Sequence, residues 1–288
     1  MKVLHVLEEA GIVPVIKISD PVLAPRLGET LFQAGLPAAE ITFRTKAASE
    51  SMRKMKDRCP ELTVGAGTVL TPEQVTQAYQ SGADFLVSPG LNQNVVHAAQ
   101  EVGLPIFPGV DSPTAIEQAL QLGIKVMKFF PAQQSGGTGF LKAMKGPYPD
   151  VTFFPTGGIN QENLIDYLRL PNVIACGGSW VVPQDLLSRG NFAEIEKTAA
   201  DAYITALGLK TVGFTPPSDV ASELFQVFSS VLSKKDVLEN SGEVLLQVNS
   251  LARMEKRLTR QGISFEKSDE EINLILPGFS IRVIGPEK

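Results

Sequence analysis

Short runs of apolar and β-branched residues alternate with polar-apolar stretches of helical period over roughly the first 180 residues of the chain. Strands without polar alternation are typical of a parallel sheet buried on both faces, and regular alternation with helices indicates repeated βα units. Eight such runs occur, at residues 13–19, 39–45, 63–69, 84–90, 105–110, 126–130, 151–158 and 173–179. Eight units predict an α/β fold, a (β/α)8 barrel of the TIM type.

The segments between these runs carry residues that start and stop helices. Thr71 is followed by a proline and can cap a helix that stops at Gly82, and residues 111–123 repeat the same scheme. A last amphipathic stretch over residues 192–208 predicts a closing helix. The barrel domain is therefore expected to occupy residues 1–208.

A second, smaller domain is predicted after the barrel. Glycine and prolines at residues 209–219 indicate a linker, and residues 220–288 predict a small α+β module. After an amphipathic helix at residues 220–232, the module shows a strand, a helix and three strands. Because four strands and one helix bury little core alone, we expect the module to pack on the barrel, on a partner or on its own copy.

Composition narrows the functional classes. The 26 Lys and Arg against 31 Asp and Glu give a net charge of -5, without the basic footprint that nucleic acid or anionic lipid requires. Two cysteines (Cys59, Cys176) and two histidines (His5, His97) lack metal-ligand spacing, and no window of about 18 apolar residues occurs. We expect a soluble cytoplasmic protein with reduced thiols and no nucleic-acid or membrane partner.

Lys128 interrupts the apolar run "VMKFF". Barrels of this type place their active sites at the C-terminal ends of the strands, where polar residues gather in this chain. Lys128 could be a snorkelling or barrel-filling lysine. Alternatively, an amine in an apolar pocket loses its proton more readily, and the neutral amine is the nucleophile that forms a Schiff base with a carbonyl. Lys17 is the competing lysine, but no helper groups surround it in the sequence.

Two other runs bring polar groups that complement Lys128. Glu40, Thr42 and Arg44 alternate along "EITFRT" and share one face of the predicted strand, while Thr68 ends the run "GAGTV". Glu40 and Arg44 could simply form an ion pair that fills the barrel. As functional groups, Arg44 could bind a substrate carboxylate and Glu40 could move protons beside an imine.

Paired glycines end the last two runs, in "PTGGI" at residues 155–159 and "CGGSW" at residues 176–180. Phosphate sites of (β/α)8 enzymes are frequently built from these two loops, because glycine lets backbone N–H groups approach an anion closely. Glycine pairs also form simple tight turns, but two pairs in the final two loops favour a phosphate site.

With these residues assembled, the first 208 residues resemble the 2-keto-3-deoxy-6-phosphogluconate (KDPG) and 4-hydroxy-2-oxoglutarate (KHG) aldolase family. The resemblance follows the order "VPVI", "EITFRT", "VGAGTVL", "SPGL", "KFFPA", "PTGGI" and "GGSWVVP". It implies a class I aldolase, which uses a Schiff base and no metal or other cofactor, and typically a homotrimer of barrels. The implied substrate is a small keto-acid phosphate, cleaved to pyruvate and glyceraldehyde 3-phosphate.

The resemblance also implies roles for individual residues. Lys128 matches the Schiff-base lysine and Glu40 the general acid/base. Four residues match positions around the keto-acid end of the substrate, namely Arg44, Thr68, Pro89 and Phe130. Six residues match the segments that bind the distal hydroxyls and the phosphate, namely Thr156, Gly157, Gly158, Gly177, Gly178 and Ser179.

Departures from the family pattern are few. Gln133 stands where an acidic residue is expected and Phe43 where a smaller aliphatic is expected, which affects only the expected fine specificity. The C-terminal module resembles one half of a vicinal oxygen chelate (glyoxalase-like) unit, but no histidine follows His97, which argues against a metal-dependent activity there.

Three alternatives remain open at this point. The substrate could be the galactonate-derived epimer of KDPG. The barrel could be a phosphate-binding isomerase or epimerase, which would share the glycine loops without needing Lys128. It could also be a non-catalytic binding protein, although the presence of both Lys128 and Glu40 argues against this.

Overall fold

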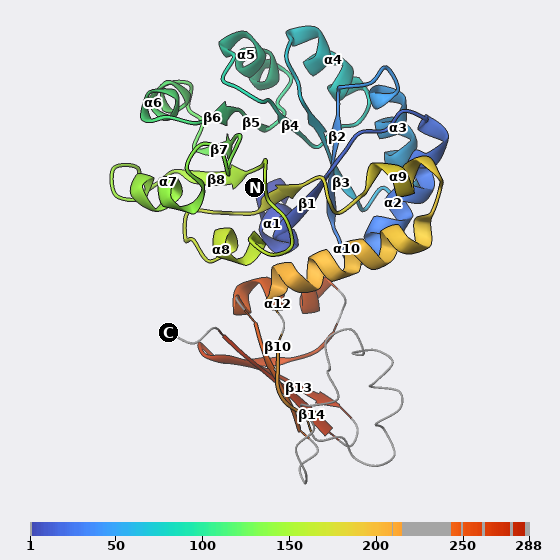
Figure 1. Cartoon of the computed structure of the whole chain (residues 1–288), viewed down its shortest axis with the longest axis vertical. Helices are drawn as coiled ribbons and strands as arrows, with labels where there is room; N and C mark the ends of the chain where they lie inside the picture. The colour runs from blue at the N-terminus through green and yellow to red at the C-terminus, as the bar shows by residue number, and fades with distance from the viewer. Residues whose placement is uncertain are drawn as a thin grey trace. The chain divides into compact units, whose positions relative to one another are not determined.

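The computed structural model describes residues 2–208, 210–214, 243–248, 250–260, 263–276 and 279–285. The chain forms two compact units, Met1–Tyr203 and Ile204–Lys288, and the boundary falls inside the long helix α10 (Phe192–Leu207). Figure 1 shows the first unit as a ring of strands with helices around it. Its strands are β1 (Ile12–Ile16), β2 (Ala38–Thr42), β3 (Thr63–Gly67), β4 (Phe85–Val87), β5 (Ile106–Phe107), β6 (Gly109–Val110), β7 (Val126–Phe129), β8 (Thr152–Pro155) and β9 (Cys176–Gly178). Its other helices are α1 (Lys2–Ala10), η1 (Pro21–Leu23), α2 (Ala24–Gln33), α3 (Ala48–Arg58), α4 (Pro72–Gln80), α5 (Gln93–Glu101), α6 (Pro113–Gln121), α7 (Gly137–Met144), α8 (Leu164–Leu168) and α9 (Gln184–Ser188).

The strands of the first unit are parallel and follow one another around a barrel, in the orders β5-β4-β3-β2-β1-β9 and β6-β7-β8. Two isolated bridges, Phe153 to Val173 and Thr156 to Gly177, join β8 to the β9 segment. The fifth predicted run is divided into β5 and β6 at Pro108, because proline has no N–H to donate to a ladder. The predicted (β/α)8 barrel is confirmed.

Helix ends in the barrel follow the residues that predicted them. The Thr71 hydroxyl accepts a hydrogen bond from the N–H of Gln74 at 3.3 Å, which caps α4. The helix ends before Gly82, whose φ of 80° is in the left-handed region that glycine adopts without strain. α6 is capped in the same way by the Ser112 hydroxyl, which accepts from the N–H of Ala115 at 3.4 Å.

An N-terminal helix that the sequence analysis did not predict closes one end of the barrel. Leu7 of α1 is fully buried in the cluster that fills the barrel interior. Phe85, Phe107 and Phe154 belong to this cluster. The ring centroids of Phe85 and Phe107 lie 5.7 Å apart, and those of Phe107 and Phe154 lie 6.3 Å apart. This apolar cluster lies beside α1, and active sites of such barrels are found at the opposite end, where the strands terminate.

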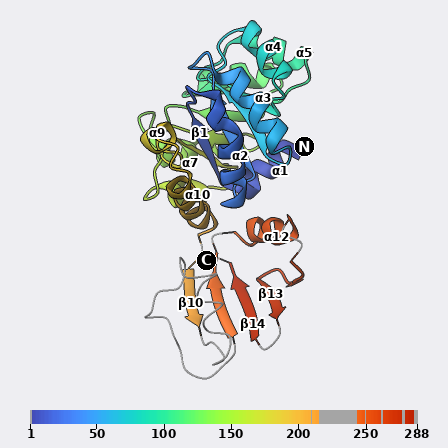
Figure 2. The ribbon, with the colours of Figure 1, turned by 90° about the vertical axis from the view of Figure 1, so that its right-hand side faces the viewer.

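The described residues of the second unit form a five-stranded sheet and the helix α12 (Figure 2). Its elements are β10 (Lys210–Phe214), β11 (Glu243–Gln247), α12 (Leu251–Arg260), β12 (Glu266–Lys267), β13 (Glu271–Leu276) and β14 (Phe279–Ile284). The strand order is β10-β11-β14-β13-β12, in which only the pair β11–β14 is parallel. Leu246, Ile272 and Val283 are buried within the unit, and α12 packs against β13.

The structure corrects the linker predicted for residues 209–219. Residues 210–214 form β10, which pairs antiparallel with β11. The glycine at position 213 favours a loop in the sequence, but it follows a register shift in this pairing, the position of a β-bulge. Residues 215–219, and the helix predicted at residues 220–232, lie outside the described residues.

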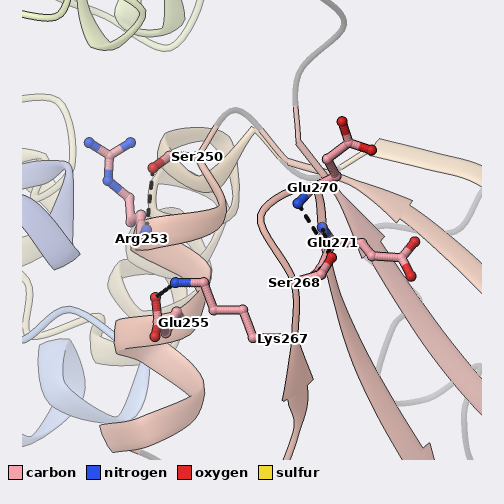
Figure 3. Close-up of polar contacts among 7 residues, drawn as sticks. All are labelled: Ser250, Arg253, Glu255, Lys267, Ser268, Glu270 and Glu271. Atoms are coloured by element: carbon pink, nitrogen blue, oxygen red, sulfur yellow. Dashed lines mark hydrogen bonds and ion pairs between the residues drawn. The ribbon is translucent and has the colours of Figure 1, made fainter.

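Polar contacts tie α12 and the edge of the sheet together (Figure 3). The Ser250 hydroxyl accepts a hydrogen bond from the N–H of Arg253 at 3.2 Å at the start of α12. Lys267 of β12 forms an ion pair with Glu255 of α12 at 2.6 Å. In the turn before β13, the Ser268 hydroxyl accepts from the backbone N–H of Glu271 at 3.2 Å. The Lys267–Glu255 ion pair and the Ser268 turn are exposed, so the buried aliphatic residues contribute more of the unit's stability than these two contacts do.

Candidate active site

Lys128 lies on β7 with its side chain inside the barrel and only 4% exposed. Its Nζ lies 4.8 Å from the centroid of the Phe130 ring. Within the described residues, the amine makes no hydrogen bond or ion pair with a side chain. Lys17, the competing lysine, is exposed. Of the two lysines, Lys128 therefore has the apolar surroundings that a nucleophilic amine requires.

Glu40 lies on β2 and is fully buried. Neither carboxylate oxygen accepts a hydrogen bond from the residues that the structure describes. Burial raises the pKa of Glu40 above its ordinary value of 4.5, while the positive charges of Lys128 and Arg44 act in the opposite direction. The three charged groups therefore lie near enough to interact, as their strand positions predict.

Arg44 follows β2 and is exposed. Its Nε donates a hydrogen bond to the Thr42 hydroxyl at 3.2 Å, and that hydroxyl donates to the carbonyl of Ile16 at 3.0 Å. This relay orients the guanidinium group while the rest of it remains accessible. Such a group can bind a carboxylate through two parallel hydrogen bonds.

Thr68 directly follows β3 and has a φ of 57°. A left-handed backbone at a β-branched residue costs on the order of 1–2 kcal/mol, so the surrounding structure must hold it. The carbonyl of the preceding residue, Gly67, accepts a hydrogen bond from the N–H of Phe43 at 2.7 Å. Strain of this kind is concentrated at binding sites, which fits the predicted place of Thr68 beside a substrate.

Pro89 lies beside the strand that neighbours Lys128. A Cβ atom on Gly109 would lie 2.0 Å from the Pro89 carbonyl oxygen, and Gly109 is the β6 partner of Lys128 in the sheet register. Pro89 thus lies against the β6 residue that pairs with Lys128, and the Phe130 ring lies beside the Lys128 amine. Both are half-buried, as expected for residues that shape a pocket.

Thr156 and the two glycine pairs lie at the ends of β8 and β9. The Thr156 hydroxyl is buried and has no hydrogen-bond partner among the described residues. It packs against Gly177, where a Cβ atom would lie 2.4 Å from the hydroxyl oxygen. Gly157 and Gly158 have φ values of 100° and 74°, which only glycine adopts readily. The structure therefore brings together the two loops that the sequence predicted for an anion.

The remaining predicted residues differ in the direction they face. Ser179 is exposed at the end of β9. Gly178 faces away from Gly177, toward Ile12 and Trp180. Gln133, the departure from the family pattern, accepts a hydrogen bond from the Tyr167 hydroxyl at 2.8 Å.

Metal ligands do not gather at this site. Among the residues that the structure describes, no group of three or more His, Cys, Asp and Glu is arranged to hold a metal ion.

Cys59 is buried, and its burial raises the pKa of the thiol. In the described part of the chain, no helix is long and apolar enough to cross a membrane.

Sequence comparison identifies a protein family and relatives to which this chain is similar. A family model for KDPG and KHG aldolases matches residues 3–198. The 2-dehydro-3-deoxy-phosphogluconate aldolase of Haemophilus influenzae is 47% identical over 194 residues, which cover 67% of this chain and 92% of the relative. The KHG/KDPG aldolase of Escherichia coli is 39% identical over 197 residues, covering 68% of this chain and 92% of the relative.

Solved structures agree with the sequence comparison. The KDPG aldolase of Legionella pneumophila, with pyruvate captured as a covalent carbinolamine intermediate, is 38% identical with a TM-score of 0.66 and covers 68% of this chain and 96% of its own. The 2-keto-3-deoxy-6-phosphogluconate aldolase of Zymomonas mobilis with 3-phosphoglycerate is 37% identical with a TM-score of 0.65. The match covers 70% of this chain and 94% of the Zymomonas mobilis chain.

Proposed function

Because this chain belongs to the KDPG and KHG aldolase family, we propose that it is a class I aldolase that cleaves 2-keto-3-deoxy-6-phosphogluconate to pyruvate and glyceraldehyde 3-phosphate. One observation carries the proposal. Lys128, an amine without a protein partner among the described side chains, lies inside the barrel within electrostatic reach of a buried carboxylate, Glu40. These two groups are what Schiff-base cleavage needs, a nucleophile and a group that moves protons.

Catalysis begins with Lys128. Its neutral Nζ attacks the C2 carbonyl of the keto acid to form a carbinolamine, which loses water to give a protonated imine. The apolar surroundings of β7 keep bulk water away from the imine. The positive imine nitrogen then draws electrons from the neighbouring bonds.

Glu40 acts as the general acid and base. Its carboxylate takes the proton of the C4 hydroxyl, the C3–C4 bond breaks, and the bonding electrons move to the iminium nitrogen. Glyceraldehyde 3-phosphate leaves, and pyruvate remains attached as an enamine. Glu40 returns the proton to C3, and water hydrolyses the imine to release pyruvate. The raised pKa of Glu40 suits this role, because a group that both takes and gives protons works best when its pKa is nearer the operating pH.

The other residues hold the two ends of the substrate. The guanidinium of Arg44 would bind the C1 carboxylate, with Thr68, Pro89 and Phe130 around the imine. The Thr156 hydroxyl would bind a distal hydroxyl group. The phosphate would accept hydrogen bonds from backbone N–H groups in the loops that contain Gly157, Gly158, Gly177, Gly178 and Ser179. The positive φ values at positions 157 and 158 and the lack of a side chain at position 177 support this assignment.

Further substrates fit the same chemistry. Cleavage of 4-hydroxy-2-oxoglutarate to pyruvate and glyoxylate uses the same imine and does not need the phosphate loops, and the galactonate-derived epimer of KDPG differs at one stereocentre. We propose KDPG as the main substrate because the glycine loops suit a phosphate, which 4-hydroxy-2-oxoglutarate lacks, and because relatives at 40–47% identity are named 2-dehydro-3-deoxy-phosphogluconate aldolases. Comparing kcat/KM for the three substrates tests this choice.

Assembly and location follow from the family resemblance. We propose a homotrimer in the cytoplasm, with the second unit contributing to assembly or stability rather than to the chemical step. Light scattering of the purified protein tests the trimer.

Borohydride reduction in the presence of pyruvate tests the mechanism. We expect a stable pyruvyl adduct on Lys128 and loss of both the adduct and cleavage activity in Lys128→Ala. Lys17→Ala is the matched control, because it removes the exposed lysine, and should retain both. An adduct that is lost in Lys17→Ala but kept in Lys128→Ala would refute the assignment. The absence of both the adduct and cleavage activity in the parent protein would favour an isomerase or epimerase instead.

A further inference from the structure

Hydrogen bonds from the described residues do not set the position of the Glu40 carboxylate. Both oxygens are buried and accept none from the described residues. A buried carboxylate is normally held by two or three donors, and those donors normally fix its orientation. The side chain of Glu40 must therefore be held by the shape of its surroundings.

Gly67 provides the surface against which Glu40 lies. It belongs to β3, where it pairs with Thr42 of β2, while Glu40 pairs with Gly65. A Cβ atom on Gly67 would lie 1.9 Å from Oε1 of Glu40, 2.6 Å from Cδ and 2.7 Å from Cγ. The carboxylate thus lies directly over the bare Cα of Gly67.

The backbone at Gly67 does not itself demand glycine. Among the described glycines, those with φ in the left-handed region do not include Gly67. An alanine could therefore adopt this backbone, and the three atoms nearest to an added Cβ all belong to Glu40. The need for glycine at this position comes from the space that the carboxylate occupies.

We propose that Gly67 is a positioning residue for proton transfer, whose missing side chain determines where the Glu40 carboxylate lies relative to the imine on Lys128. Gly67 touches neither substrate nor reacting atoms, and acts only through Glu40. This inference rests on the proposed aldolase function.

Gly67→Ala tests the inference. Ordinary contact begins near 3.4 Å, so an added methyl group must displace Oε1 by about 1.5 Å from its 1.9 Å position. A displacement of this size at a catalytic group lowers the rate by about 100-fold. We expect kcat to fall by this factor and KM to stay within about threefold, because the groups that bind substrate are unchanged.

Gly65→Ala is the matched control. It adds a methyl group to the same strand two residues earlier, on the same face, where the Cβ would lie 2.2 Å from the Phe85 ring. Both variants overpack the barrel and should lower thermal stability, but Gly65→Ala should keep kcat within about threefold of the parent. Equal losses of kcat in the two variants would overturn the proposal, as would normal kcat in Gly67→Ala.

A double-mutant cycle separates positioning from general damage. Glu40→Ala removes the carboxylate together with the Cγ and Cδ atoms that lie within 2.7 Å of the Cβ position on Gly67. In the Glu40→Ala background, Gly67→Ala should lower the residual kcat by less than about threefold, whereas independent effects would multiply and contradict the proposal. If Gly67→Ala alone does not fold, recovery of folding in the double variant supports the clash, and continued unfolding overturns it. The pyruvyl adduct on Lys128 reports separately on the proposed function.

Discussion

Glu40→Gln should make the protein more stable and nearly inactive, and the gain in stability should depend on pH. Burial raises the pKa of Glu40 in the folded state, so the folded protein holds this proton more tightly than the unfolded chain does. The proton therefore contributes stability below the ordinary pKa of 4.5, and this contribution is lost as pH rises through the folded-state pKa. The uncharged amide of the Glu40→Gln variant would resemble the protonated carboxyl group at every pH.

The expected gain in stability of the Glu40→Gln variant follows from the surroundings of the Glu40 carboxylate. Burying an ion costs several kcal/mol after relaxation, and the described residues provide no hydrogen bonds to Glu40 in return. The charges of Lys128 and Arg44 offset part of this cost. We expect a net gain of about 2 kcal/mol for the variant at about pH 8, which for a barrel of this size raises Tm by roughly 4–8 °C. The amide cannot move a proton, so kcat should fall by about 10²–10⁴.

Thermal unfolding followed by circular dichroism at about pH 5 and about pH 8 measures the effect. Glu101→Gln on α5 is the control, because this carboxylate is exposed, and its Tm should change by less than about 2 °C at either pH. The difference in Tm between Glu40→Gln and the parent should grow as pH rises. A parent protein that gains stability relative to Glu40→Gln on going to higher pH would refute the reasoning.

Three further predictions concern the reaction and the second unit. EDTA should leave the cleavage rate unchanged, because the iminium is the electron sink, and a loss of activity restored by zinc or magnesium would contradict this mechanism. Ser179→Asp should raise KM for the phosphorylated substrate at least about tenfold while changing KM for 4-hydroxy-2-oxoglutarate little, because it adds a like charge beside the phosphate; equal effects on both would remove the phosphate assignment. Truncation after Gly208 should leave kcat nearly unchanged but lower Tm or change the oligomer size, and a folded trimer with a large loss of kcat would show that the second unit reaches the active site.

Much of the barrel could be predicted from sequence because its signals are local. Each strand is a short apolar run, and the caps at Thr71 and Ser112 depend on residues within one helical turn. Lys128 and Glu40 could be selected because charges inside such runs have few structural explanations. In the structure both side chains are buried, and their catalytic roles stay a prediction.

Other features could not be predicted because their cause lies elsewhere in the chain. Residues 2–10 have an apolar face, but the apolar surface against which this face packs, at the open end of the barrel, forms only in the folded protein. β10 contains a glycine that is typical of a linker, and only its pairing with β11 makes it a strand. Gly67 and Gly109 carry no functional group, so their contacts with Glu40 and Pro89 are visible only in three dimensions.

The two ends of the barrel differ in what their residues do for stability. At the α1 end, Leu7 packs with Phe85, Phe107 and Phe154 in an apolar cluster, which favours folding. At the opposite end, the Glu40 carboxylate and the Thr156 hydroxyl are buried without protein hydrogen bonds from the described residues, and Thr68 has a strained backbone. Each of these costs free energy in the absence of substrate, so sequence changes that favour stability alone would remove them. Their presence together at the mouth near Lys128 is explained if substrate provides the missing partners, which is the expected property of a catalytic site.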